Sequence, residues 1–546
     1  MAEQKGKVVR QAAFLMAAQM ISSVIGLLYR SPLHMMMGDA GDGYYTYAYD
    51  WYTIILLISS YSIPSAVSKV MAERLAVKKY KSASKVFRAA LIYVVIVGGA
   101  GALAAFFGAP YFLAKQPNAV LALRVLAPTI FLSGILGCFR GFFQAHNTMK
   151  PTAISQVIEQ LMNAIFSVLM AYLLTRPYVG GDDTVRGMYG AAGGTIGTGV
   201  GVVSGLAFML FAYFYNRKNV QKRVRIDTRS KDETYGQVFN TIFMMVTPII
   251  LATCVYNLTS VVDQVIFTNI MSARGSTAKA TAELYGLFGY RFKPIINIPI
   301  ALASATSTAL IPAVAASMAE GNKDDAIAKI DECIKLTMFI AIPSAIGICI
   351  LSYPVIFVLY PSGNVVGAAK LLTLGAISVI FYSLSTVTNG VLQGLGHPSV
   401  PVRNAAIALA VNAGVTAICV GPLNINVYGI LAATVLYSFT VMLLNSMALN
   451  RYLGYSHHLN QFTAPLKSAL LMGAVVAVIY WVPHLLLPSV FGRYLFSAVL
   501  LVIAVLAGIL VYFIAYGKFN ELTDEELRRM PMGTRMLQLF RKLHIR

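Results

Sequence analysis

Five basic side chains fall inside long apolar runs of the sequence, where a charge is costly. They are Arg30, Lys69, Arg140, Arg291 and Lys293. At the centre of a membrane span each such group costs about 2.5–3.5 kcal/mol. Two readings account for them. The side chain either lines a polar, water-accessible cavity or reaches back to the headgroup region along its aliphatic stem.

Depth separates these two readings. Lys69 and Arg140 lie near the cytoplasmic ends of their runs, and Arg30 lies near the outer end of its run, so all three are close to headgroups. With a rise of 1.5 Å per residue, Arg291 lies about 12 Å below the outer end, and Lys293 lies about 3 Å deeper. These last two favour a cavity. Excess positive charge there predicts an anionic substrate, with Arg30, Lys69, Arg291 and Lys293 as the substrate-binding residues.

Acidic groups are fewer in the apolar runs. Asp50, Glu159 and Asp263 either pair with the cations or bind a coupling ion, Na⁺ or H⁺. A transporter of cationic drugs is expected to have excess carboxylate in its cavity instead.

Enzyme chemistry has no support in the sequence. The chain contains no HExxH, GxSxG or Walker pattern, so neither hydrolysis nor ATP drive is indicated, and no catalytic residue, metal or cofactor is expected. The glycine-rich stretch at residues 187–197 lacks the Lys-Ser/Thr of a phosphate loop. Small residues in such a stretch are typical of closely packed membrane helices.

The composition indicates the elements that hold these residues. The chain has 546 residues, of which 57% are hydrophobic and 12% are charged, and its mean hydropathy is +0.68. Soluble domains carry about 25% charged residues. These values exclude a soluble enzyme, a secreted disulfide scaffold and a disordered chain, and they predict an integral protein of the plasma membrane. The net charge of +21 is then explained by cytoplasmic loops rather than by nucleic acid binding.

Fourteen apolar runs are long enough to cross a bilayer as helices, which needs about 20 residues each. Their residues are 11–37, 44–72, 87–113, 120–145, 152–174, 188–215, 238–271, 283–316, 332–359, 367–396, 400–422, 428–450, 466–488 and 493–516. Basic residues concentrate on the side that holds both termini, so N-in and C-in orientation is expected. The predicted fold is all-α and polytopic.

An internal repeat organises these spans. Residues 63–73 resemble residues 311–320, and residues 141–145, followed by Pro151, resemble residues 390–394, followed by Pro398. The two matches share nearly one offset, which predicts two six-helix repeats with the same orientation, followed by two extra helices. The predicted parts are a bundle at 1–216, a basic cytoplasmic linker at 217–237, a second bundle at 238–452, two helices at 453–516 and a basic tail at 517–546.

With these features the chain resembles the MOP (multidrug/oligosaccharidyl-lipid/polysaccharide) exporter superfamily, and within it the MurJ/SpoVB-type lipid II flippases and polysaccharide transporters. The segment from residues 284–286 through Arg291 to residues 298–299 and 310–312 carries the best match. The resemblance places cavity arginines in spans 1, 2 and 8. Arg291 fits the third, and Arg30 lies one residue further from Gly26 than the pattern has. Lys69 lies five residues after Pro64, where the pattern has an arginine four residues after the proline. A further arginine of span 1 falls near Ser23 and is missing here.

The resemblance implies a flippase that moves an undecaprenyl-pyrophosphate-linked cell-wall precursor, with lipid II as the expected substrate, by alternating access. Membrane potential, with Na⁺ or H⁺ coupling, would drive it, and spans 13 and 14 would hold the lipid tail. Membrane lipids and the cell-wall synthesis machinery are the expected partners. The alternatives are a Na⁺/H⁺-coupled multidrug exporter of the same fold, a polysaccharide-repeat-unit flippase, and a non-transporting scaffold for wall or spore assembly.

Overall fold

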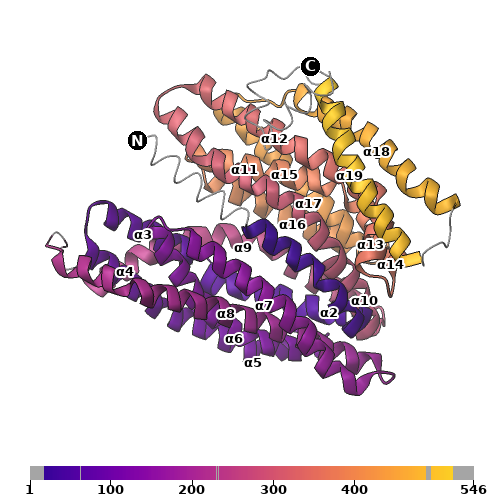
Figure 1. Ribbon diagram of the computed structural model, residues 1–546, viewed down its shortest axis with the longest axis horizontal. Helices are drawn as coiled ribbons and strands as arrows, with labels where there is room; N and C mark the ends of the chain where they lie inside the picture. The colour runs from indigo at the N-terminus through magenta and orange to yellow at the C-terminus, as the bar shows by residue number, and fades with distance from the viewer. Residues whose placement is uncertain (1–17, 62, 229, 231–232, 487–492, 520–546) are drawn as a thin grey trace. The chain divides into compact units, whose positions relative to one another are not determined.

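The computed structural model describes residues 18–61, 63–228, 230, 233–486 and 493–519 (Figure 1). Secondary structure in this part of the chain is helical throughout, without strands. The chain divides into two compact units, Met1–Gly286 and Leu287–Arg546. The predicted basic tail at 517–546 lies outside the described residues except for its first three.

The first unit begins with a helix over Ala18–Leu28. It continues with α2 (Arg30–Leu56), η1 (Leu57–Tyr61), α3 (Ile63–Ala76), α4 (Tyr80–Tyr93), η2 (Val94–Gly98), α5 (Gly99–Phe112), η3 (Pro117–Ala119), α6 (Val120–Ala145), α7 (Lys150–Thr175), η4 (Arg176–Tyr178), α8 (Asp183–Ile226), α9 (Tyr235–Ala273) and α10 (Ala278–Gly286). Helix α8 packs along α7 and against α2 and α6, α3 and α5 pack on α6, and α10 packs on α2.

The second unit begins with η5 (Leu287–Phe292). It continues with α11 (Lys293–Ala319), α12 (Lys323–Ile350), α13 (Ser352–Leu359), α14 (Val365–Gly375), α15 (Ser378–Gly394), α16 (Ser399–Val420), α17 (Val427–Leu453), α18 (Asn460–Leu486) and α19 (Arg493–Phe519). Helix α11 packs against α12 and α15, and α17 packs against α15 and α16.

The predicted polytopic, all-helical class is confirmed for the described residues. Ten of their helices are long and apolar enough to cross a membrane, or eleven if the bent pair α14–α15 counts as one span. Helix α6 covers the predicted run 120–145, and helix α16 lies within two residues of the predicted run 400–422 at both ends. The number of fourteen spans and the orientation of the chain stay predictions.

Glycines allow helix α8 to approach helix α7 closely. A Cβ atom added at Gly193 would lie 2.5 Å from the backbone of Ala171, and one added at Gly197 would lie 2.1 Å from the Ser167 hydroxyl. Contacts under 3.0 Å are not tolerated by real Cβ atoms, so larger residues would force the two helices apart. The prediction that the 187–197 stretch serves close helix packing is therefore confirmed.

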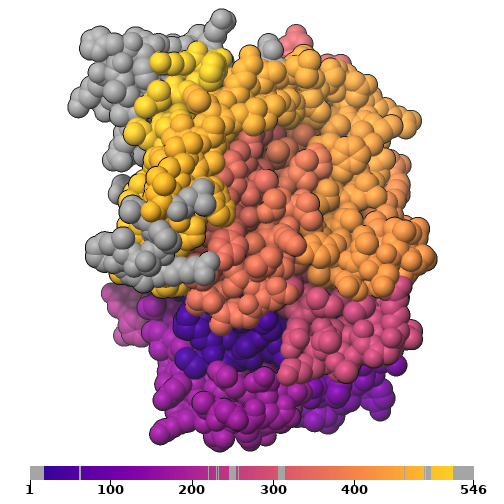
Figure 2. All heavy atoms as spheres, turned by 90° about the vertical axis from the view of Figure 1, so that its right-hand side faces the viewer, coloured from indigo at the N-terminus to yellow at the C-terminus, as the bar shows by residue number. Residues whose placement is uncertain are grey.

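Two C-terminal helices pack on the second unit. Helix α18 contacts α12, and α19 lies beside α18 (Figure 2, amber and yellow). A polar contact anchors the start of α18, because the Gln461 side-chain amide donates to Asp331 on α12 and to the Tyr455 hydroxyl. These are the helices predicted to follow the second repeat.

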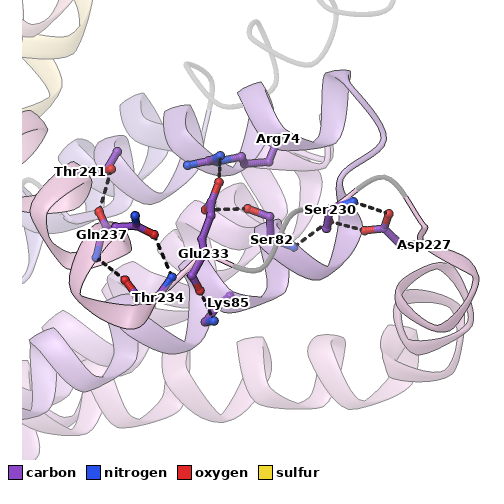
Figure 3. A network of polar contacts seen from close by, with 9 residues as sticks. All are labelled: Arg74, Ser82, Lys85, Asp227, Ser230, Glu233, Thr234, Gln237 and Thr241. Atoms are coloured by element: carbon purple, nitrogen blue, oxygen red, sulfur yellow. Dashed lines mark hydrogen bonds and ion pairs between the residues drawn. The ribbon is translucent and has the colours of Figure 1, made fainter.

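The predicted linker folds onto α3 and α4 of the first unit (Figure 3). Glu233 accepts from Arg74 and, at 3.0 Å, from the Ser82 hydroxyl, and Lys85 donates to the Glu233 backbone carbonyl. Asp227 accepts from the backbone N–H of Lys81 at 2.7 Å. Two acidic residues thus neutralise part of this basic segment and fix the chain that enters α9.

Candidate functional site

The buried cation of the second unit is Arg291. It lies on the π-helical turn η5 and is 0% exposed. Its guanidinium carbon lies 5.6 Å from the centre of the Tyr360 ring, in the range of a cation–π contact. The Tyr360 hydroxyl in turn donates to the Tyr290 backbone carbonyl at 3.4 Å. Arg291 is thus fully buried and lies against an aromatic ring.

Lys293 follows on the first residue of α11. Its side chain is half-buried, and its Nζ lies 4.8 Å from the centre of the Phe288 ring. Phe288 stacks on Phe292 at 5.5 Å, and a Cβ added at Gly375 would meet the Phe292 ring at 2.4 Å, so α14 packs tightly on this turn. Each cation of the segment therefore lies against an aromatic ring.

The other two predicted substrate-binding residues lie in the first unit. Arg30 is half-buried at the start of α2 and interacts electrostatically with Tyr45 and Tyr49. Lys69 lies on α3 and is exposed. Each unit thus contributes one pair of predicted cations.

The acidic candidates of the first unit have different surroundings. Asp50 on α2 accepts a hydrogen bond of 2.7 Å from the Tyr285 hydroxyl, which also lies 3.2 Å from the Ser260 backbone carbonyl. Asp263 on α9 is 2% exposed and interacts electrostatically with Tyr285. Tyr285 thus donates to Asp50 and lies within the electrostatic reach of Asp263.

Glu159 forms an ion pair with Arg140. The distance between Arg140 Nη2 and Glu159 Oε2 is 2.6 Å, and Arg140 Nε donates to the Ser155 hydroxyl at 3.0 Å. The two charged side chains are 16% and 27% exposed. Pairing with a carboxylate and a hydroxyl compensates the guanidinium for lost water.

A cluster that sequence reasoning missed lies at the bend of α2. His34 Nδ1 lies 3.0 Å from Asp42 Oδ1, and His34 Nε2 lies 3.9 Å from Asp39 Oδ1. His34 and Asp42 are each 1% exposed. Gly38, with φ +69°, turns the chain between them and brings the three side chains together. Their ligand atoms lie within 4.8 Å of one another and are of types that a cation accepts.

The first unit also contains a cavity of about 300 Å³ between α2, the end of α5 and α9. Trp51, Gln116 and Gln264 are among the residues that line it. These three side chains are uncharged, so a search of the sequence for charged residues in apolar runs does not find them.

Helices of membrane-spanning length in both units define a multi-pass membrane protein, and the buried Arg291 and Asp263, within predicted spans, indicate a functional site. The family profile "Polysaccharide biosynthesis protein" matches residues 8–318, and the profile "MatE" matches residues 248–418. The first match covers more than half of the chain, so the chain belongs to the polysaccharide biosynthesis protein family. The predicted membership of the MOP superfamily is confirmed.

Relatives match over nearly the full chain. Lipid II flippase MurJ of Bacillus subtilis is 26% identical over 542 residues, which cover 96% of this chain and 98% of that protein. Stage V sporulation protein B of the same organism is 22% identical over 538 residues, which cover 96% of this chain and 97% of that protein.

Solved structures share the fold. A lipid II flippase MurJ in an inward closed conformation has a TM-score of 0.65 at 16% identity and covers 92% of this chain and 98% of its own. An inward-facing MATE family transporter of the MOP superfamily has a TM-score of 0.64 at 14% identity, with 82% and 100% covered.

Proposed function

We propose that this protein is a flippase that moves an undecaprenyl-pyrophosphate-linked cell-wall precursor, with lipid II the expected substrate, from the inner to the outer leaflet by alternating access. The observation that carries the proposal is the fully buried Arg291 on a π-helical turn, in the part of the chain that both family profiles match. In a transporter whose substrate carries a pyrophosphate, a buried guanidinium can bind that group.

The substrate chemistry follows from the charges. A pyrophosphate that leaves water needs donors to replace its hydration, and charge-assisted hydrogen bonds are the strongest available. Arg30, Lys69, Arg291 and Lys293 are proposed to supply them. Arginine can grip a phosphate with two parallel bonds, whereas lysine acts as a point charge. We therefore expect Arg291 to contribute more than Lys69, whose side chain is exposed.

The proposed topology has fourteen spans with both termini in the cytoplasm. In that orientation an inside-negative potential favours export of a negative headgroup by about 2.3 kcal/mol per charge at 100 mV. Na⁺ or H⁺ coupling would add to this drive. The ion is proposed to bind at Asp50 and at the buried Asp263, since binding at Glu159 would require breaking its ion pair with Arg140. Translocation breaks no covalent bond, so no catalytic residue is assigned and no cofactor is required.

The test is reconstitution into liposomes with fluorescent lipid II and an imposed potential. Arg291→Gln removes the charge while retaining much of the side chain, and Arg403→Ala, an exposed arginine of the same unit, is the matched control. Hydrogen bonds to charged groups contribute about 1.5–3 kcal/mol, so Arg291→Gln should slow translocation about 10- to 100-fold. A folded Arg291→Gln variant with wild-type rate would refute the role of Arg291. No translocation by the wild-type protein would refute the proposed function.

A second candidate is a cation-coupled multidrug exporter. The buried Asp263 and the structural likeness to a MATE family transporter favour it. Loss of cationic-dye efflux in Asp263→Asn, with Arg291→Gln harmless, would support this function. Translocation of other lipid-linked oligosaccharides in preference to lipid II would instead indicate a polysaccharide-repeat-unit flippase.

A further inference from the structure

The cavity of the first unit that Trp51 lines has aromatic walls. Trp51 on α2 and Phe112 at the end of α5 stack with their ring centres 4.6 Å apart and their planes at 12°. On another wall, the Tyr47 hydroxyl and the Thr268 hydroxyl lie 2.8 Å apart. The volume of about 300 Å³ is at the small end of ligand pockets. It suits one ring-sized molecule rather than an extended chain.

Buried polar groups also line this cavity. Gln116 is 2% exposed and Gln264 is 3% exposed. Among the described residues, no hydrogen-bond partner reaches either atom of the Gln116 amide, Gln264 Oε1 or Trp51 Nε1. By contrast, Gln264 Nε2 donates to the Tyr47 backbone carbonyl at 3.4 Å. Proteins rarely leave buried polar atoms unsatisfied, because each loses its hydrogen bonds to water without replacement.

The hydrogen-bonding groups of the lining determine which class of ligand the cavity can bind. They offer two carbonyl acceptors, one amide donor and one indole donor beside an aromatic surface, and the only charged residue of the lining is the exposed Lys115. A phosphate would need more positive charge than this. A pyranose ring meets every requirement, because its hydroxyls both donate and accept and its C–H face is apolar enough to pack on an aromatic ring.

We propose that this cavity is a saccharide-binding subsite that takes one neutral pyranose ring. Gln116 and Gln264, whose unsatisfied polar atoms are buried in the cavity wall, would turn toward the sugar and bond its hydroxyls, with Trp51 and Phe112 forming the apolar wall. The identity of the sugar rests on the proposed function: it is a headgroup sugar of the lipid-linked substrate. In the proposed orientation the loop from α5 to α6 is on the outer side of the membrane, so the subsite would hold the sugar after crossing.

The chain carries its own reporter for this site. It contains two tryptophans, Trp51 and Trp481, so Trp481→Phe leaves Trp51 as the single indole. The full-length Trp481→Phe protein in nanodiscs is titrated with N-acetylglucosamine, with glucose and with glycerol as the control for solvent effects. We expect a saturable change in Trp51 emission with a sugar at a Kd of about 1–10 mM, typical of weak binding of a small ligand, and no saturable change with glycerol.

Gln116→Leu in the same background is the decisive variant. Its amide has no hydrogen-bond partner among the described residues, so the thermal stability should be retained while the apparent Kd rises at least 10-fold, about 1.4 kcal/mol. Gln144→Leu, in the same unit but outside the cavity lining, is the matched control and should bind like the parent. If the Gln116→Leu variant does not fold, Gln116→Met replaces it in the same titration.

Two results would overturn the subsite: Trp51 emission that responds to no sugar, or a response equal in parent and folded Gln116→Leu protein. Either result would mean that the cavity holds water and not a sugar. The titration uses neither a lipid-linked substrate nor transport, so it is independent of the liposome assay for the flippase. A transporter that moves lipid II but binds no free sugar refutes the subsite alone, and a protein that binds sugar but moves no lipid refutes the flippase alone.

Discussion

The ion pair between Arg140 and Glu159 supports a double-mutant prediction. At 2.6 Å and an effective dielectric constant of about 20, the Coulomb attraction is about 6 kcal/mol, before the cost of desolvating both groups. Breaking a buried pair by removing one partner costs about 3–5 kcal/mol. The partial exposure of both side chains reduces this, so we expect Arg140→Met to lower the free energy of unfolding by about 2–3 kcal/mol.

The double variant Arg140→Met, Glu159→Leu should regain most of that loss, since neither charge is then left alone. Unfolding in mixed micelles gives the four free energies of the cycle, and we expect the coupling to exceed about 2 kcal/mol, because each single variant leaves one charge without its partner. The same proteins are then assayed for translocation. If the only role of Glu159 is to neutralise Arg140, the double variant should still translocate the substrate. A single variant as stable as the wild-type protein would refute the reasoning about the pair, and an inactive but stable double variant would assign Glu159 to ion coupling.

Two further predictions concern packing and pH. Gly197→Leu should separate α7 from α8 because the added Cβ meets Ser167 at 2.1 Å. Overpacking of this kind costs about 1–3 kcal/mol or more, measured as a fall in melting temperature, whereas Gly99→Leu, with open space around the added Cβ, should have little effect. Burial lowers the pKa of His457, in the connection from α17 to α18, from its usual 6.5. The unfolded chain then binds more protons, so stability should fall as the pH drops below about 6.5 and through the lowered pKa of the folded state. His457→Gln should show a smaller fall in melting temperature between pH 7.5 and 5, and an equal fall would contradict this assignment.

Apolar runs predicted the positions of helices well, and their ends less well. The run that predicts a span at 188–215 belongs to α8, which continues to Ile226 because lysine, arginine and glutamine are good helix formers outside the membrane. Similarly, α12 begins at Lys323, before the predicted run, because Asn322 caps it by accepting from the backbone N–H of Asp325. Hydropathy locates the bilayer part of a helix, and capping locates its end.

The candidate site was predictable only where charge interrupts an apolar run. Arg291 and Glu159 were found in this way, although the partner of Glu159 depends on how α6 and α7 pack. The proximity of His34 and Asp42 depends on the backbone of one glycine, Gly38, which composition does not reveal. Gln116 carries no charge and lies in a loop, so its burial follows only from the folded chain.

The π-helical turn η1 determines in which direction the side chains of the following helix point. A π turn contains one residue more than an α turn, and one residue corresponds to about 100° of rotation in an α-helix. The direction in which Lys69 points is therefore determined by the length of Leu57–Tyr61 and not by α3 alone. Deleting a single residue from this turn would rotate the side chains of α3 to a different face without changing any of them, so relatives that differ here by one residue cannot be compared position by position.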